Sequence, residues 1–484
     1  MAKNLSYRHI LKYTGVFGGI QAINVLSSVL RNKAAAILID RYGQGISELF
    51  NSTINLVSSA TTLIIPVAIV RKISFLFEKL GRNSVSVVHT VKVIRSWSVL
   101  TGIIGTLLVM LSCPLLSRVT CDSHEFTKSY FFLSPMLLML SVNGTEVAIL
   151  KATRQLKQLV TASFIGSFST LIICVVSYYF WSIRGVVISL NASLFVVTML
   201  NIKYSTRFFP YKVSPFCKKI LLQGKSLIKL SVSFMLAALI AALSETLIRT
   251  YISQSGSIEN VGLYAAGFAL TVTYTRFIFN AMDADYYPHL AGICSDNVLM
   301  NTAVNKQITV CVQLIVPCLL LFVLFLPEVV TLFYTYKYLE IVPMVICGTI
   351  YMFCKAVITP IAYVALAKAD SKMYLVIESI SAIILGTSVV VGYEYYSLTG
   401  CGIGLSFSNL VDAIIIYTVY YKRYNIRMRK NTMFALICQF LILVIGICAI
   451  SFCKEYSLKL TIVLLAILSS VILSVLSLYK KINS

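Results

Sequence analysis

The chain has 484 residues, of which 58% are hydrophobic and 12% are charged, and its mean hydropathy is +0.86. Soluble globular proteins carry about 25% charged residues, so this composition excludes a soluble enzyme, a disordered chain and a collagen. The net charge of +23 fits either nucleic acid or an anionic membrane surface, and the placement of the cations decides between them.

Apolar runs long enough to cross a bilayer recur along the whole chain, and they predict an all-α polytopic membrane protein with about 14 transmembrane helices. The predicted spans, in chain order, are 14–39, 46–70, 96–117, 130–150, 158–181, 185–202, 230–252, 260–282, 307–334, 341–366, 373–393, 400–421, 432–453 and 458–479. The connections between them are too short to hold a folded soluble domain.

Lysine and arginine are concentrated on alternate connections. With the N-terminus in the cytoplasm, cytoplasmic segments hold 29 of the 41 basic residues, the opposite side holds 7, and 5 lie inside spans. This bias follows the positive-inside rule and places both termini in the cytoplasm. The cations then meet anionic membrane lipids, and we predict no nucleic-acid partner. One connection, 283–306, is acidic for its side.

Two stretches, Ile149–Arg154 and Ala365–Asp370, resemble each other in place and in their small and basic residues. They follow the fourth and tenth predicted spans, as expected for two halves of six spans in the same orientation. We therefore predict four parts: an N-terminal six-helix bundle at 1–202, a basic cytoplasmic linker at 203–229, a C-terminal six-helix bundle at 230–421, and two additional transmembrane helices at 432–479.

Charged side chains at membrane depth are costly and face a cavity or a partner. The basic residues found inside the predicted spans are Arg31, Lys33, Arg249, Arg276 and Lys355. The acidic residues identified there are Glu245, Glu378 and Asp412. A net positive interior suits an anionic head group, and guanidinium groups suit pyrophosphate in particular.

Each of these charges also has a purely structural interpretation. Lys33 is near enough to a span end to snorkel to the interface. Glu245 and Arg249 are spaced i, i+4 and can neutralise each other, and Glu378 can pair with Lys355 on the neighbouring span. Asp412 is either an interhelical hydrogen-bonding group or a protonatable site.

The sequence contains no arrangement typical of a cofactor, metal or catalytic site. The 13 cysteines are scattered through apolar runs, the four histidines are dispersed, and no nucleophile and base stand together. Asp283-Ala284-Asp285 has the Asp-x-Asp spacing of some glycosyltransferases but lacks a surrounding nucleotide-binding domain. We predict no enzyme activity, no cofactor and no metal.

Several stretches resemble bacterial O-antigen and oligosaccharide-repeat-unit flippases (Wzx-type). They are Lys12-Tyr13-Thr14, Gly18-Gly19, Arg31-Asn32-Lys33, Gly43-x-Gly45, Gly262–Ala266, Met282–Pro288 and Lys355–Lys368. The resemblance implies the multidrug/oligosaccharidyl-lipid/polysaccharide exporter superfamily, in which two six-helix bundles face each other in a V. The two additional spans are similar to the lipid II flippase branch. His289 departs from the pattern, which has a firmly basic residue there.

This resemblance implies translocation of undecaprenyl-pyrophosphate-linked oligosaccharide across the bacterial inner membrane, for O-antigen or another surface polysaccharide. Arg31, Arg249, Arg276 and Lys355 would then bind the pyrophosphate. Glu245, Glu378 and Asp412 are candidates to bind H⁺ or Na⁺ as the coupling ion. The polysaccharide polymerase and chain-length machinery are candidate partners.

Three alternatives remain open. A cation-coupled multidrug exporter would share the fold, but the excess of intramembrane cations disfavours it. A polymerase or ligase acting on lipid-linked glycans would need a large outer loop, and the longest outward connection, 118–129, is short. A scaffold would gain nothing from intramembrane charges.

Overall fold

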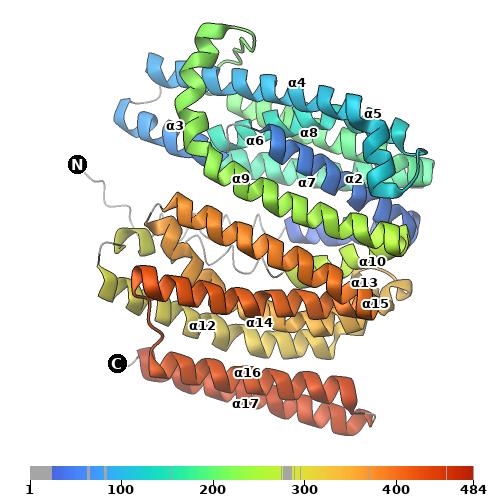
Figure 1. Cartoon of the computed structure of the whole chain (residues 1–484), viewed down its shortest axis with the longest axis vertical. Helices are drawn as coiled ribbons and strands as arrows, with labels where there is room; N and C mark the ends of the chain where they lie inside the picture. The colour runs from blue at the N-terminus through green and yellow to red at the C-terminus, as the bar shows by residue number, and fades with distance from the viewer. Residues whose placement is uncertain are drawn as a thin grey trace. The chain divides into compact units, whose positions relative to one another are not determined.

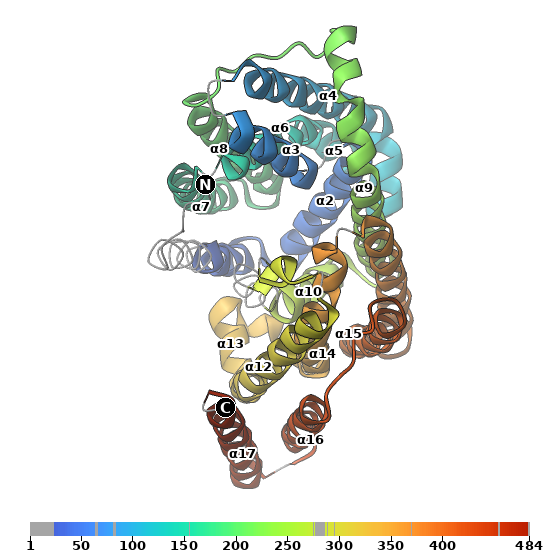
Figure 2. The ribbon, with the colours of Figure 1, turned by 90° about the vertical axis from the view of Figure 1, so that its left-hand side faces the viewer.

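The computed structural model describes residues 24–62, 66–80, 84–153, 155–273, 275, 286–287, 289–294, 296–368, 370–453 and 455–482. These residues form helices joined by short connections, and no strand occurs among them (Figures 1 and 2). The chain divides into two compact units, Met1–Ala265 and Ala266–Ser484.

Unit 1 begins, within the described part of the chain, with a helix at 24–38. The helices that follow are α2 (Asp40–Thr61), α3 (Pro66–Leu80), α4 (Val85–Cys121), α5 (Thr127–Leu133), α6 (Pro135–Ala152), α7 (Leu156–Trp181), α8 (Gly185–Thr206), α9 (Lys218–Ser255) and the start of α10 (Ile258–Phe268). A short 3-10 helix, η1 (Ser182–Arg184), joins α7 to α8.

Unit 2 continues from α10 into a π-helical turn, η2 (Ala269–Thr273). The remaining elements are α12 (Asn297–Leu324), α13 (Leu326–Phe333), η3 (Tyr336–Ile341), α14 (Val342–Ala367), α15 (Ser371–Tyr424), α16 (Lys430–Phe452) and α17 (Tyr456–Ile482). The predicted all-α polytopic class is confirmed.

Nine stretches of the described residues are helical, long and apolar enough to cross a membrane. Two of them, Lys157–Thr206 and Ser371–Tyr424, each contain two predicted spans. The second is α15, a helical hairpin that turns at Tyr396 and Ser397, where Ser397 has a φ of 50°. The two arms approach so closely that a Cβ on Gly392 would meet the carbonyl of Gly400. The predicted spans 14–39 and 260–282 lie partly outside the described residues.

Two segments expected as connections are partly helical. The predicted span 46–70 is divided, because α2 ends at Thr61 and α3 begins at Pro66 and runs to Leu80. Proline favours the first turn of a helix, and the basic residues of α3 lower its hydropathy. Likewise α9 begins at Lys218, inside the predicted linker 203–229. The predicted division into bundles and linker stays a prediction.

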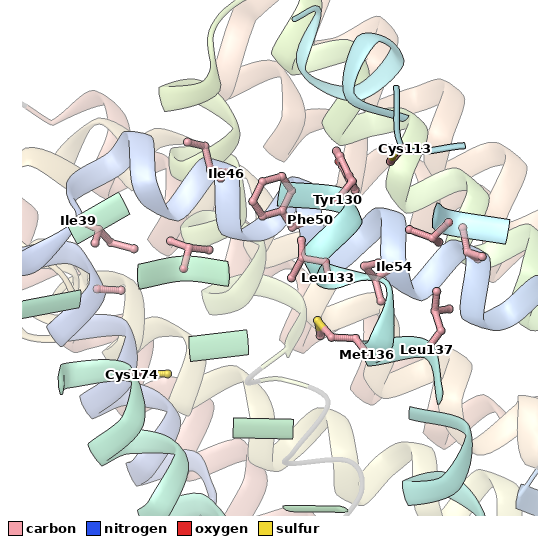
Figure 3. Close-up of a cluster of buried hydrophobic side chains, with 14 of the residues drawn as sticks. Ile39, Ile46, Phe50, Ile54, Cys113, Tyr130, Leu133, Met136, Leu137 and Cys174 are labelled. Atoms are coloured by element: carbon pink, nitrogen blue, oxygen red, sulfur yellow. The ribbon is translucent and has the colours of Figure 1, made fainter. Parts of the chain in front are cut away.

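The core of unit 1 is built around the apolar face of α2 (Figure 3). Ile46, Phe50 and Ile54 recur every four residues and are each about 1% exposed. Phe50 meets Tyr130 of α5 edge to face, with ring centroids 5.0 Å apart. The Tyr130 hydroxyl reaches Thr120 at 2.7 Å, so the aromatic body is buried while its polar tip keeps a hydrogen bond.

A buried ion pair joins α4 to α6. Arg95 Nε and Nη2 donate to the two carboxylate oxygens of Glu146 at 2.7 and 2.8 Å, and both side chains are at most 1% exposed. Such a bidentate pair is the strongest geometry available to these groups. The Ser205 hydroxyl, at the end of α8, donates to Glu146 Oε2, the oxygen that also accepts from Arg95 Nη2.

The same guanidinium also orders the connection between α8 and α9. Arg95 Nη1 donates to the carbonyl oxygens of Phe209 and Pro210 at 3.1 and 3.0 Å, and its guanidinium lies 4.9 Å from the ring centroid of Tyr211. One side chain therefore holds three helices and the following loop in register.

We expect Glu146→Gln to lower the free energy of unfolding by about 3–5 kcal/mol, since it leaves a buried guanidinium without its counter-charge. Thermal unfolding of the purified protein in detergent measures this change. The exposed Glu125→Gln is the control and should change stability by at most about 0.5 kcal/mol. Equal stability of both variants would contradict the assignment.

A polar contact fastens the C-terminal helices within unit 2. Gln439 of α16 accepts from the Ser470 hydroxyl of α17 at 2.7 Å and donates to Ser474 at 3.1 Å. Ser474 in turn donates to the carbonyl of Gln313 in α12 at 2.8 Å. Buried polar groups that satisfy one another in this way fix the register of neighbouring helices.

Asp370 ends the connection between α14 and α15. One carboxylate oxygen accepts from the Met373 backbone N–H at 3.1 Å, which caps α15. The other accepts from Arg423 at 2.6 Å and from the Tyr424 hydroxyl at 2.9 Å. Partial burial raises the pKa of Asp370, but these hydrogen bonds outweigh it, and the net pKa is lowered.

We expect this contact to stabilise the fold at neutral pH and to lose that effect in acid. A carboxyl group whose pKa is lowered by folding stabilises the folded state at pH values above its ordinary pKa, which is about 4. That contribution disappears as the pH falls through the lowered pKa of the folded state. Thermal unfolding of the native protein and Asp370→Asn should therefore differ at pH 7 and converge toward pH 3. A difference that widens in acid would contradict the assignment.

Candidate functional site

Two cavities inside unit 1, of about 410 and 350 Å³, share Arg31, Thr170 and Val197 in their walls. Arg31 lies on the helix at 24–38. The larger cavity is also lined by polar side chains of Asn24, Ser27, Ser28, Asn143, Lys151, Ser163, Ser167 and Asn201. The smaller is also lined by those of Asn32, Gln44, Ser47, Glu48, Asn51, Asn55, Ser189 and Ser193.

The pattern of α2 explains why these side chains face inward. Gln44, Glu48, Asn51 and Asn55 follow the spacing of one helix face, and all four line the smaller cavity. The opposite face carries the apolar core residues around Phe50. A helix with one apolar and one polar face, in a bundle surrounded by lipid, separates a packed core from a polar interior.

Two further helices present polar faces in the same way. In α7, Ser163, Ser167 and Thr170 line the larger cavity, and the Ser167 hydroxyl donates to Asn24 at 2.7 Å. In α8, Asn201 donates to Asn143 of α6 at 2.8 Å. Polar contacts therefore tie the walls of the larger cavity together.

One acceptor in this wall is left unsatisfied. Asn201 is 5% exposed, and its Oδ1 has no hydrogen-bond partner among the described residues. Since buried carbonyl oxygens in proteins are nearly always hydrogen-bonded, this atom is available to a water molecule or a ligand hydroxyl.

Arg249 of α9 lies between two carboxylates. Its guanidinium is 3.5 Å from Glu48 and 3.6 Å from Glu245, and its side chain is 8% exposed. The structure therefore contains the pairing of Glu245 with Arg249 that the i, i+4 spacing allows. Arg31 lines both cavities, whereas Arg249 lines neither of them. The role of Arg249 in binding pyrophosphate stays a prediction.

The sequence count of intramembrane acids was incomplete. Glu48 and Glu146 lie in α2 and α6, within the predicted spans 46–70 and 130–150. Single acids inside apolar runs barely change a window average, so hydropathy alone passes over them. With Glu328 of α13, in the predicted span 307–334, the predicted spans hold six acidic residues against the five basic residues found there, so the positive charge excess inferred from the sequence disappears. Lys151, assigned to a loop, also lines the larger cavity.

The remaining predicted site residues belong to unit 2 or lie outside the described residues. Arg276 is among the latter. Lys355 of α14 lies 5.5 Å from the ring centroid of Tyr351 and within electrostatic range of Asp412. Glu378 of α15 lies near Tyr374 and Tyr420.

Asp412 is the most enclosed of the three predicted ion-coupling carboxylates. It is 4% exposed, and one of its oxygens interacts with the Ser381 hydroxyl on the other arm of α15. Its Oδ1, like the Oδ1 of Asn409 one turn earlier, has no partner among the described residues. Unsatisfied oxygens of this kind can accept a proton or an alkali cation.

A family model described as "Polysaccharide biosynthesis protein" matches residues 57–343, more than half of the chain. The chain belongs to the polysaccharide biosynthesis protein family. No curated protein sequence matches significantly.

The polysaccharide biosynthesis protein shares its fold with solved membrane transporters. It is similar to the lipid II flippase MurJ in an inward closed conformation, with a TM-score of 0.71 and 13% identity over 98% of this chain and 100% of the other. It is also similar to an inward-facing multidrug resistance MATE family transporter, with a TM-score of 0.68 and 14% identity over 84% and 94%.

A third similar structure is a transporter of the MOP superfamily from Pyrococcus furiosus, described as having a binding pocket of reverse polarity. Its TM-score is 0.62, with 14% identity over 86% of this chain and 96% of the other. These neighbours are described as transporters or as a flippase. At these identities the likeness shows the fold.

We expect Arg249→Gln to destabilise unit 1, because it leaves Glu48 and Glu245 facing each other without the cation between them. The cost should be about 1–3 kcal/mol, measured by thermal unfolding in detergent. Adding Glu48→Gln to this variant should restore part of the loss. A double variant less stable than Arg249→Gln alone would show that Glu48 is stabilised by something other than Arg249.

Proposed function

We propose that this polysaccharide biosynthesis protein is a flippase for undecaprenyl-pyrophosphate-linked oligosaccharide repeat units. It would carry them from the cytoplasmic to the outer leaflet of the bacterial inner membrane by ion-coupled alternating access. The observation that carries the proposal is the pair of polar cavities in unit 1 that share Arg31.

The cations of the larger cavity match the head of such a substrate. Arg31 and Lys151 both line it, and no acidic side chain lines it among the residues that the structure describes. A guanidinium group offers paired donors to phosphate oxygens, whereas an ammonium group acts as a compact charge. We infer that Arg31 binds the pyrophosphate first and that Lys151 supplements it on the side expected to be cytoplasmic.

The remaining lining matches a carbohydrate. Serine hydroxyls and asparagine amides occupy most of the polar positions in both cavities. Such groups donate and accept hydrogen bonds, as sugar hydroxyls require. Sites for drug-like molecules are instead lined predominantly by apolar side chains. The lining therefore favours a glycan over a hydrophobic drug.

Asp412 is the leading candidate for ion coupling, with H⁺ or Na⁺ as the ion. Its buried carboxylate is enclosed beside Asn409 and within range of Lys355. Protonating or metallating it changes the charge that Lys355 faces, and that change is the kind of local event that biases a transporter between states. Glu245 is instead engaged with Arg249.

We expect Arg31→Ala to slow substrate movement by roughly 30-fold or more, as loss of one charged partner of a bound anion commonly costs at least that factor. The measurement uses purified protein in liposomes containing a fluorescent undecaprenyl-pyrophosphate disaccharide, with and without a pH or Na⁺ gradient. Arg118→Ala, an exposed cation away from the cavities, should keep native rates.

Native rates in Arg31→Ala would reject the cavity assignment. Absence of movement in the native protein, shown to be folded and inserted, would reject the flippase itself. The second candidate, cation-coupled drug export, is favoured by one observation, the Glu48 carboxylate in the smaller cavity. Efflux of a cationic dye that is lost in Glu48→Gln would support that alternative.

A further inference from the structure

A third hollow in unit 1 differs from the two polar cavities in its lining residues and in their character. It has a volume of about 740 Å³ and lies along α8 where that helix packs against α5 and α6. None of its lining residues belongs to the two cavities that contain Arg31. We call it the α5–α8 groove; it is defined by Lys128, Phe132, Met139, Arg184, Ile188 and Phe195.

The floor of the groove is apolar and open to the surroundings. Phe132, Ile188 and Phe195 are 64%, 41% and 47% exposed, and Met139 and Ala192 lie among them. In a helix bundle within a membrane, exposed aromatic and aliphatic side chains of this kind meet hydrocarbon chains. The surface is concave, so it can enclose a chain along its length.

One end of the groove is basic. Lys128 is the second residue of α5, just after the loop that follows α4, and Arg184 is the last residue of η1, directly before α8. The connection from α4 to α5 and the connection from α7 to α8 therefore lie at the same end of unit 1, and both cations line that end of the groove. Neither forms an ion pair with any acidic residue that the structure describes. The acids of the adjacent loop, Asp122 and Glu125, are exposed and do not line the groove.

The neighbouring aromatic residues indicate the depth of that end. Tyr179, Phe180 and Trp181, directly before η1, are 72%, 69% and 51% exposed. Exposed tyrosine and tryptophan are characteristic of the membrane–water interface. Arg184 follows three residues after Trp181, so the basic end lies at head-group level and the apolar floor lies within the hydrocarbon.

The walls of the groove are held in place by a helix break. Pro135 ends the regular hydrogen bonding between α5 and α6, because it has no backbone N–H. The Asn191 amide of α8 then donates to the carbonyl of Phe132 at 3.1 Å and to that of Val187 at 3.0 Å. The groove is thus preformed by contacts that lie at its own edge.

We propose that the α5–α8 groove binds an anionic membrane phospholipid. The phosphate of its head group would lie between Lys128 and Arg184, and one acyl chain would follow Phe132, Met139 and Phe195. Two cations without acidic partners match an anionic head group better than a zwitterionic one. The inference concerns the lipid environment and does not depend on what the cavities transport.

The test measures lipid selectivity directly. Native mass spectrometry of the full-length protein, released from mixed phosphatidylglycerol and phosphatidylcholine micelles, counts the lipids of each class that are retained. The native protein should retain phosphatidylglycerol preferentially. Lys128→Gln with Arg184→Gln should weaken that preference by roughly 25-fold, as each cation near an anionic membrane surface contributes about a fivefold attraction.

Two further variants separate the groove from general charge. Arg118→Gln with Lys459→Gln removes the same number of cations from the same predicted side of the membrane, and it should leave the preference unchanged. Ala192→Phe fills the floor without altering charge, and it should reduce retention of phosphatidylglycerol. All these side chains lie at exposed or partly exposed positions, so folding should be preserved.

Three results would overturn the proposal: no phosphatidylglycerol preference in the native protein, an unchanged preference in the Lys128 and Arg184 variant, or an equal loss in the Arg118 and Lys459 control. Because no transport is measured, these outcomes are independent of the flipping assay. A protein that retains phosphatidylglycerol yet moves no lipid-linked glycan would keep this inference and reject the proposed function.

Discussion

The hydrocarbon that surrounds the helices offers no partner to a polar group, and the arrangement of unit 1 follows from that constraint. Amides and hydroxyls of α2, α7 and α8 have only the interior to face, and there they line two cavities. The apolar face of α2 packs behind them around Phe50. The polar interior is therefore built by the same helix amphipathicity that builds the core, and it requires no separate domain.

Charges in this interior are divided between those that hold the fold and those that face space. Arg95 and Glu146 satisfy each other almost completely and order the end of α8. Glu48 belongs to both groups, because it lines the smaller cavity and also approaches Arg249 of α9. A change of charge in that cavity is thus felt by α9, which is additionally bonded to α2 through Thr246 and the carbonyl of Ser52. This shared carboxylate is a physical route from cavity to helix.

The sequence predicts the class of protein and most of its spans, because each crossing is encoded locally in a long apolar run. It also indicates Arg31, since an arginine in such a run has few places to lie other than a cavity. The sequence does not indicate which charged residues pair with each other. Arg95 stands one residue outside its predicted span, and nothing local connects it with Glu146, 51 positions later. The division of the span at 46–70 was missed because α3 is amphipathic and basic, which hydropathy alone interprets as a loop.

The hairpin of α15 has a consequence for the candidate ion site. The backbones of the two arms are in close contact at Gly392 and Gly400. They are again in close contact at Gly404, where a Cβ would meet the carbonyl of Ser388. Further along the same arms, Ser381 and Asp412 interact from opposite sides. The distance between the two arms is therefore set near the turn, and it in turn limits the distance between the arms at Ser381 and Asp412. These three glycines, which have no side chain, thereby determine how closely the Ser381 hydroxyl can approach the carboxylate of Asp412.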